Sequence, residues 1–173
     1  MHEDVLDLES RRTIYQTVKK FAGSHFREIQ RRSGLAVGSV QYHLHFLARH
    51  DLIKEEKQGN NVVYYPREIG SDDAKLLRLL RQKSIRDVLI SLLLHHAQSH
   101  EELARFVKLS PSTLSWHLKK LVQEKLIKGD KKGRKTMYRI IYDKDALIKL
   151  LITYQESFLD NLVDHVIEMW DFE

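Results

Sequence analysis

The chain has 173 residues, of which 42% are hydrophobic and 31% charged, a composition typical of one or two globular domains. It contains no cysteine, which excludes disulfide bonds and thiolate metal sites. The longest apolar run, Val88 to Leu94, is interrupted by Ser91 and is too short to cross a bilayer. Because Met1 to Glu9 is acidic and lacks the apolar core of a signal peptide, we expect a cytoplasmic protein with no membrane partner.

The net charge of +5 is unevenly distributed along the chain. Residues 1–70 carry +2, residues 71–140 carry +9 and residues 141–173 carry −6. A basic segment followed by an acidic one favours a polyanionic partner for the middle of the chain. Charge alone leaves open a second interpretation, a lysine-rich surface that is only solvated.

Helical spacing dominates the first part of the chain. Apolar positions predict helices over residues 11–22, 26–33 and 38–50. The third helix carries Val40, Leu44 and Leu47 on one stripe, which we expect to be buried.

A hairpin and a connector follow these helices. The sequence Gln-Gly-Asn-Asn over 58–61 predicts a turn between two strands, and Pro66 is expected to end the second strand. Ser71 and the two aspartates after it cap a leucine-rich helix over 74–82. We interpret this helix as a semi-rigid connector.

Three local signals open helices in the second half of the chain. Ser84-x-x-Asp87 and Ser99-x-x-Glu102 both have the form of a capping box. Ser110-Pro111 supplies an N-cap followed by proline at the first helical position, where the missing N–H costs nothing.

The helix after Ser110 carries Leu114, Leu118 and Leu121 on one buried stripe. Two strand-like segments come next, joined by a hairpin loop over 131–135 with Gly133 at its tip. Two helices, a tight turn, a third helix and a hairpin form the element order of a winged helix-turn-helix.

Residues 143–170 read as one long amphipathic helix. Its apolar positions, spaced three or four apart, are Leu147, Leu150, Leu151, Tyr154, Phe158, Leu162, Val166 and Met169. Such a helix is roughly 40 Å long, more than one small domain can cover. We expect the remainder to form a homodimer interface; the alternative is that it folds back on the first part of the chain.

The chain contains the same pattern twice. A shift of 74 places residues 10–65 on 84–139 without a gap, so that Tyr42-His43-Leu44 aligns with Trp116-His117-Leu118 and Gly59 with Gly133. A repeat this long is a small domain and not a solenoid unit. The predicted fold class is therefore mainly α with small β-hairpins (α+β). The predicted domains are 1–70 and 84–142, joined by the connector 71–83 and followed by the helix 143–173.

The second copy resembles the winged helix-turn-helix domain of ArsR/MarR-type regulators. The residues that carry the resemblance are Glu102-Leu103-Ala104, Leu109 to Leu121, Leu126-Ile127, Gly133-Arg134 and Tyr138-Arg139. The first copy resembles it through Glu28-Ile29, Ser39 to Leu44, Leu47, Leu52-Ile53 and Tyr64. Two such units in one chain resemble the tandem regulators common in archaea, which implies sequence-specific binding of double-stranded DNA and transcription regulation.

In a helix-turn-helix the second helix of the motif lies in the major groove. The buried stripes leave two outward sets as DNA-binding candidates: Ser39, Gln41, Tyr42 and His45 in the first copy, and Ser112, Thr113, Ser115, Trp116 and Lys119 in the second. Gln41 can pair with adenine, but no arginine is present to read guanine, so DNA shape is expected to contribute. Tyr42 and Trp116 either stack on sugars or pack under the hairpins.

The two wings differ in charge. Lys131, Lys132, Arg134 and Lys135 surround the tip of the second wing, whereas the first wing offers Asn60 and a single cation, Lys57. Because phosphate contacts dominate affinity, we expect the second domain to bind DNA more strongly. The first domain would supply discrimination or a protein contact.

Histidines raise two further possibilities. His43 and His117 occupy equivalent places, where we favour a hydrogen bond to nearby backbone over contact with DNA. We expect no metal or other cofactor, although His95-His96-x-x-x-His100 and Asp160, Asp164 and His165 are the groups that could supply ligands.

Other functional classes find less support in the sequence. No glycine-rich phosphate loop, nucleophile motif or paired carboxylates are recognisable, so we expect no enzyme activity. Aromatic stacking platforms for RNA are sparse. The main alternative is a winged-helix module for protein–protein assembly, which would not need the basic wing.

Overall fold

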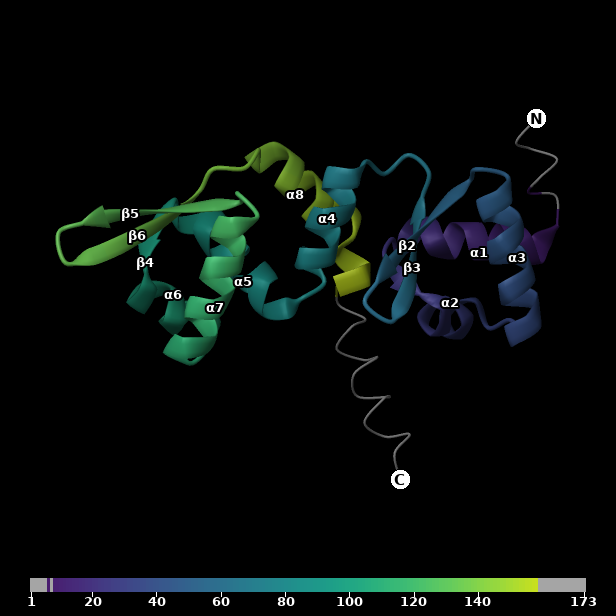
Figure 1. The fold of residues 1–173 in the computed structure, drawn as a ribbon, viewed down its shortest axis with the longest axis horizontal. Helices are drawn as coiled ribbons and strands as arrows, with labels where there is room; N and C mark the ends of the chain where they lie inside the picture. Colours follow the sequence, from purple (N-terminus) through teal and green to yellow (C-terminus); the bar gives the residue numbers. More distant parts are fainter. Residues whose placement is uncertain (1–5, 7, 159–173) are drawn as a thin grey trace, which may run out of the picture. The chain divides into compact units, whose positions relative to one another are not determined.

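The computed structural model describes residue 6 and residues 8–158, and divides them into two units. The first unit runs to Arg78 and resumes at Tyr154, and the second spans Leu79–Thr153 (Figure 1). The division therefore falls within a helix and not at residues 70 and 84. Among the described residues, no helix is both long enough and apolar enough to span a membrane.

The first unit follows the predicted order, with one strand added. Its elements are α1 (Glu9–Lys20), β1 (Ser24–His25), α2 (Phe26–Ser33), α3 (Val37–Arg49), β2 (Ile53–Gln58) and β3 (Asn61–Pro66). Strand β1 was not predicted, because two residues are too few to show a period. It pairs antiparallel with β3 and makes the hairpin a three-stranded sheet of order β1-β3-β2.

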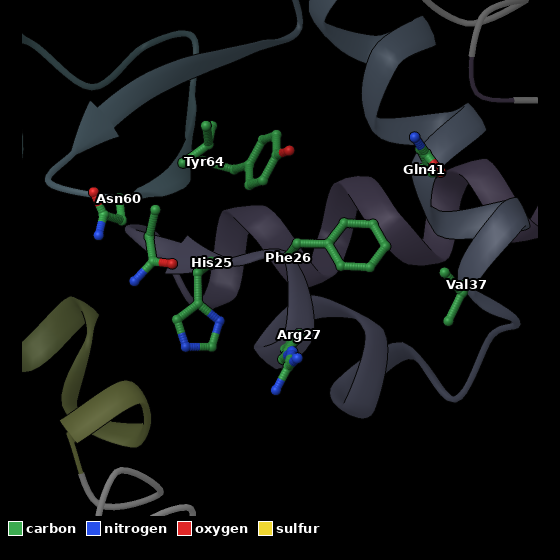
Figure 2. Close-up of a pocket in the computed structure, with 9 residues that line it drawn as sticks. His25, Phe26, Arg27, Val37, Gln41, Asn60 and Tyr64 are labelled. Carbon is green, nitrogen blue, oxygen red and sulfur yellow. The ribbon is translucent and has the colours of Figure 1, made fainter.

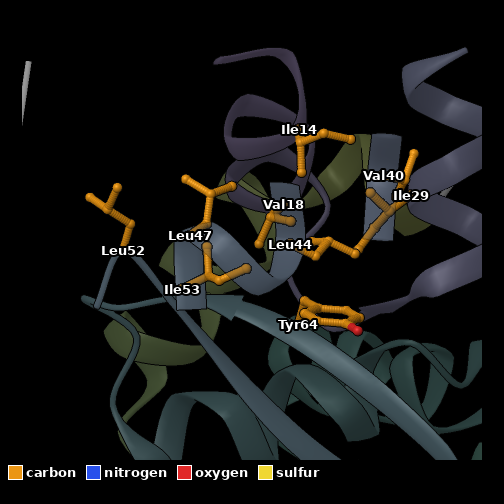
Figure 3. Packing of buried hydrophobic residues seen from close by; sticks show 9 residues of the cluster. All are labelled: Ile14, Val18, Ile29, Val40, Leu44, Leu47, Leu52, Ile53 and Tyr64. Carbon is orange, nitrogen blue, oxygen red and sulfur yellow. The ribbon is translucent and has the colours of Figure 1, made fainter. Parts of the chain in front are cut away.

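Helices α1, α2 and α3 pack around one apolar core against the sheet (Figure 3). The core comprises Ile14, Val18, Ile29, Val40, Leu44, Leu47, Leu52, Ile53 and Tyr64. The predicted stripe of α3 is confirmed, since its three apolar residues are at most 2% exposed. The stripe fixes which face of α3 is left for solvent.

The second unit repeats these elements. They are α5 (Lys83–His95), β4 (Ala97–Ser99), α6 (His100–Val107), α7 (Pro111–Gln123), β5 (Ile127–Lys132) and β6 (Lys135–Ile140), with sheet order β4-β6-β5. The shift of 74 carries eight of the nine core residues onto buried positions here, namely Val88, Leu92, Leu103, Leu114, Leu118, Leu121, Leu126 and Ile127, whereas Tyr64 maps onto the half-buried Tyr138. The same sequence pattern thus builds the same core twice.

Two of the three caps predicted in the second half of the chain are confirmed, whereas the cap predicted at Ser71 is wrong because α4 already begins at that residue. Ser99 and Glu102 form a reciprocal capping box at α6, and the Ser110 side chain accepts a hydrogen bond from the Thr113 N–H at the start of α7. The capping box at Ser84 is wrong. Helix α5 begins one residue earlier, at Lys83, and Asp87 pairs with Lys83 at 2.6 Å.

The connector and the C-terminal helix are copies of one element. The shift of 74 carries helix α4 (Ser71–Leu80) onto residues 145–154, which overlap α8 (Lys144–Thr153) in all but its first residue. Both follow the last strand of a winged unit and both bury leucines, such as Leu76 and Leu150. The repeat is therefore longer than the hairpin-ended segment that the sequence comparison suggested.

The prediction of one helix over 143–170 is wrong in its described part. Helix α8 ends at Thr153, and Tyr154 forms a turn before helical residues resume at Gln155. The physical reason is that the apolar residues serve two cores: Leu147 and Leu150 lie in the second unit, whereas Tyr154 and Phe158 are buried residues of the first. Residues 159–170 of the predicted helix lie outside the described range.

The segment after the turn is held to the first unit. Glu156 forms an ion pair with Lys20 at the end of α1, and Ser157 is 1% exposed. Burial and the nearby carboxylates of Glu68 and Asp73 raise the pKa of Tyr154. This described part follows the alternative that the chain folds back on the first domain.

Candidate nucleic-acid interface

Helices α3 and α7 present the predicted outward residues to solvent. In α3, Gln41, Tyr42 and His45 are exposed and Ser39 is half-buried. They lie opposite the buried stripe that contains Leu44, so the leucine packing orients them. The geometry thus brings the first predicted set together on one helix face.

Hydroxyl groups at the start of α7 are already hydrogen-bonded within the protein. Ser110 Oγ lies 2.8 Å from Thr113 Oγ1 and 3.2 Å from Ser112 Oγ. Ser115 Oγ donates to the Pro111 carbonyl and lies 2.9 Å from His100 Nε2. These contacts fix the hydroxyls in place and occupy part of their hydrogen-bonding capacity.

Trp116 and Lys119 complete the outward face of α7, and both are exposed. Trp116 is 58% exposed and Tyr42 is 60% exposed, so neither ring packs under its hairpin. Lys120 Nζ lies 5.4 Å above the Trp116 ring, within cation–π range. Packing under the hairpins is therefore wrong, and stacking on sugars stays a prediction.

Each wing turns through two residues with glycine first. Gly59 and Gly133 have φ of +60° and +64°, and the strands close on Gln58–Asn61 and Lys132–Lys135 pairs. Positive φ at the first loop position alone is the mark of a type II′ turn, which glycine permits. The turn places Arg134 at the tip, and the three lysines of the wing lie on the strands.

The second wing carries the predicted cations in exposed positions. Within the described part of the chain, Lys131, Lys132 and Arg134 have no ion pair, whereas Lys135 Nζ lies 2.9 Å from Glu101 Oε2. The hydrogen bond from Lys135 and its charge lower the pKa of Glu101, so this carboxylate is ionised near neutral pH. Three of the four cations are thus available for an external anion.

Beside α3, the first unit has an open hollow with a different character (Figure 2). Its volume is about 670 Å³, and its lining includes Phe26, Arg27, Gln41, Asn60 and Tyr64. The predicted residues Gln41 and Asn60 lie on its two sides. The hollow is lined by the rings of Phe26 and Tyr64 and by neutral carboxamides, and Arg27 is the only lysine or arginine in its lining.

His43 and His117 are core residues, 4% and 8% exposed. Each ring meets the preceding aromatic residue edge-on, with centroids 5.2 Å and 5.0 Å apart. Burial lowers the pKa of both, with smaller contributions from Arg11 and Lys120 respectively. The structural interpretation is correct about burial, but neither Nδ1 has a hydrogen-bond partner among the described residues, contrary to the expected backbone bond.

The histidine group at the α5–α6 junction forms no recognisable metal centre. Among the described residues, no three His, Cys, Asp or Glu side chains are placed to hold an ion. His95 instead contacts Phe106 edge-on, and His100 reaches Ser115. Asp160, Asp164 and His165 lie outside the described residues.

Sequence reasoning missed the residues at the start of α2 and α6. Phe26 and Arg27 line the hollow of the first unit, and His100 and Glu101 contact α7 and the second wing. Position 26 maps onto 100, and position 27 onto 101, by the shift of 74. That equivalence was available in the sequence, but nothing marked these positions as neighbours of a wing.

Two family models match the chain. Residues 8–77 match a model described as an N-terminal helix-turn-helix domain, and residues 81–128 match one described as winged helix-turn-helix DNA-binding. The first match lies in the first structural unit, and the second covers the second unit up to strand β5.

Two curated relatives are named as HTH-type transcriptional regulators. One, from Methanocaldococcus jannaschii, is 32% identical over 149 residues, covering 85% of this chain and 36% of that protein. The other, YdfF from Bacillus subtilis, is 40% identical over 73 residues, covering 42% of this chain and 32% of that protein. The chain thus spans about a third of the length of these relatives.

Two solved structures are similar to parts of the chain at low identity. HlyU from Vibrio cholerae is 22% identical, with a TM-score of 0.43, over 49% of this chain and 90% of that one. The antimony-specific transcriptional repressor AntR is 22% identical, with a TM-score of 0.41, over 61% of this chain and 89% of that one. TM-scores this low carry no inference about function.

Proposed function

Because the chain is a tandem winged helix-turn-helix protein of the kind found in transcriptional regulators, we propose that it regulates transcription by sequence-specific binding of double-stranded DNA. It would act in the cytoplasm, associated with the nucleoid, without enzyme activity or a cofactor. The observation that carries the proposal is the pairing, in the second unit, of an exposed recognition helix with a wing of three unpaired cations. This is the combination that base readout and phosphate binding require.

The two units contribute unequally to affinity in this proposal. The second wing reaches phosphates through Lys131, Lys132 and Arg134, and Trp116 and Lys119 lie along the groove. In the first unit Gln41 reads a base edge, and the neutral wing adds little electrostatic attraction. The first domain therefore contributes discrimination more than affinity.

We further propose a homodimer that forms through the C-terminal helical region. Helix α8 buries Leu147 and Leu150 but leaves Ile148 and Ile152 exposed by 40% and 63%. A second copy that covers these isoleucines would place four winged units on one assembly. Light scattering on the Ile148→Glu/Ile152→Glu variant tests it: the proposal requires a dimer in the wild type and a monomer in the variant.

Titration into labelled random-sequence duplex DNA, followed by fluorescence anisotropy at several salt concentrations, tests DNA binding. The proposal requires binding that weakens steeply as salt rises, because each neutralised phosphate releases condensed counterions. Selection of the preferred sequence from a random pool would then identify the operator. Absence of binding at low salt would overturn the proposal and leave the protein–protein assembly module as the function to pursue.

A further inference from the structure

The hollow of the first unit continues into a second one beside it. The second hollow is about 500 Å³ in volume and shares Phe26, Gln41 and Tyr64 with the first. Together they form a groove that runs from the wing turn to the middle of α3. Each volume lies within the range of small-molecule sites.

Phe26, which is half-buried, and Tyr64, which is 9% exposed, form the floor of the groove, and its sides carry polar side chains beside Val37 and Val62. Figure 2 shows the rings of Phe26 and Tyr64 between the wing turn at Asn60 and helix α3 at Gln41. The carboxamides of Gln41, Asn60 and Asn61 are exposed along its edges, where each can donate and accept hydrogen bonds. A flat ring with polar edges suits this lining, because aromatic faces stack on planar rings.

Charge is arranged with opposite signs at the two ends of the groove. Arg27 is exposed and lines the first hollow, whereas the carboxylate of Glu55 lines the second. An anionic group of a ligand would therefore lie at the Arg27 end, where a guanidinium binds phosphate oxygens in a bidentate manner. Hydrogen-bond donors of the ligand would lie at the Glu55 end.

In the second unit the residues at the equivalent positions contact one another. Phe26 and Gln41 correspond to His100 and Ser115, which are hydrogen-bonded to each other at 2.9 Å. Arg27 and Asn61 correspond to Glu101 and Lys135, which form an ion pair at 2.9 Å. These four positions thus form two contacting pairs in the second unit, whereas their counterparts in the first unit line the groove.

We propose that this groove binds a nucleotide, with the base stacked against Phe26, beside the largely buried Tyr64, and the phosphate held by Arg27. The ligand is either a free mononucleotide or an unpaired nucleotide of a single strand, since both offer the same ring and phosphate. A base with an exocyclic amino group fits best, because such a group donates to Glu55. A bound ligand covers Gln41, so on the proposed function of this protein it would also reduce duplex binding by the first domain.

Calorimetric titration of the full chain with AMP, GMP and CMP tests this assignment. The control titrations use inorganic phosphate, and a short single-stranded oligonucleotide forms a separate arm. The key variant is Arg27→Glu/Asn61→Lys, which introduces the ion pair of the second unit. Gln16→Glu, an exposed change on α1 with the same net change in charge, is the matched control.

The expected result is mononucleotide binding that the double variant weakens by at least about tenfold and that Gln16→Glu leaves unchanged. If the oligonucleotide alone binds, with the same sensitivity to the double variant, the site is supported and its ligand is a strand. Failure of both probes to bind, binding equal to that of inorganic phosphate, or equal binding by the double variant would overturn the assignment. None of these titrations contains duplex DNA, so they can fail while duplex binding through the second wing succeeds, and the reverse.

Discussion

Lys135 on strand β6 and Glu101 in the first turn of α6 form an ion pair at 2.9 Å, although 34 residues separate them. The pair joins the second wing to the helix that precedes the recognition helix. It also places a carboxylate beside the cations proposed to bind phosphate. An exposed ion pair like this contributes little to folding stability. Its main effect is therefore the electrostatic one, on an anion that approaches the wing.

Replacing Glu101 by glutamine should strengthen DNA binding. The substitution removes a negative charge and releases Lys135, which adds about one phosphate contact and steepens the salt dependence by about 0.9 in logarithmic units. Affinity at low salt should rise roughly three- to tenfold. Anisotropy titrations at several salt concentrations measure both quantities. Glu124→Gln, an exposed change at the end of α7, is the control, and an unchanged slope in Glu101→Gln would contradict the assignment of this wing.

Reversing the three unpaired wing cations should abolish most DNA affinity. The variant Lys131→Glu/Lys132→Glu/Arg134→Glu removes up to three phosphate contacts and adds repulsion, so we expect a loss of at least about a hundredfold and a salt slope lower by about 2.7. A control that reverses three exposed cations elsewhere, Lys75, Arg78 and Lys144, keeps the net charge equal. Survival of binding with the wild-type slope would show that the wing does not contact DNA.

Acidification should destabilise the protein through its buried histidines. Burial holds the pKa of His43 and His117 below their ordinary value of 6.5, so the unfolded chain takes up protons before the folded one. Stability is therefore retained above pH 6.5 and falls as the pH drops below it. Thermal unfolding between about pH 7.5 and pH 5.5 should show a declining midpoint.

The variant His117→Leu should make that decline smaller, with His43 left as the second contributor, whereas a change of the exposed His45 to glutamine should not. Leucine cannot take up a proton and has a volume close to that of histidine. A decline as steep in His117→Leu as in the wild type would show that other groups cause the acid sensitivity.

Two serines that share a sequence motif should differ in their effect on stability. Ser99→Ala removes the cap of α6 and should cost about 1 kcal/mol, because the N–H of Glu102 loses its acceptor. Ser84→Ala lies inside α5, where alanine is the better helix former, and should be neutral or slightly stabilising. Urea unfolding measures both, and a comparable loss in the two variants would contradict the structure.

Glycine at positions 38 and 133 should also respond in opposite directions. Gly38 lies in the first turn of α3 with no heavy atom within 4 Å of an added Cβ, so Gly38→Ala should stabilise by about 0.5–1 kcal/mol. Gly133 has φ +64°, and Gly133→Ala should destabilise by about 1 kcal/mol. The melting temperatures of the two variants, relative to wild type, test both expectations.

Periodic and local signals predicted the winged units well. The stripes around Leu44 and Leu118, the capping box at Ser99 and the wing glycines all depend on residues close in sequence, so pattern alone specifies them. The sequence did not reveal β1 and β4, because each acquires its structure only by pairing with a distant strand.

The parts that escaped prediction depend on contacts between distant residues. The end of α8 at Thr153 reflects a competition between two cores for the apolar residues on either side of it. The His100–Ser115 and Glu101–Lys135 contacts, and the groove that their counterparts leave open, join elements 15 or more residues apart. Helical periodicity records which face is buried, but not which partner covers it.

The route of the chain makes the second unit a nested insertion. The described chain starts in the first unit, passes through Leu79–Thr153 and returns to the first unit at Tyr154. The second unit is one continuous segment and the first is built from two, so cutting the chain at Arg78 would separate Tyr154 and Phe158 from the rest of the first unit. Unfolding of the inserted unit would loosen both of the chain segments that enter and leave it, and is therefore expected to lower the stability of the first unit.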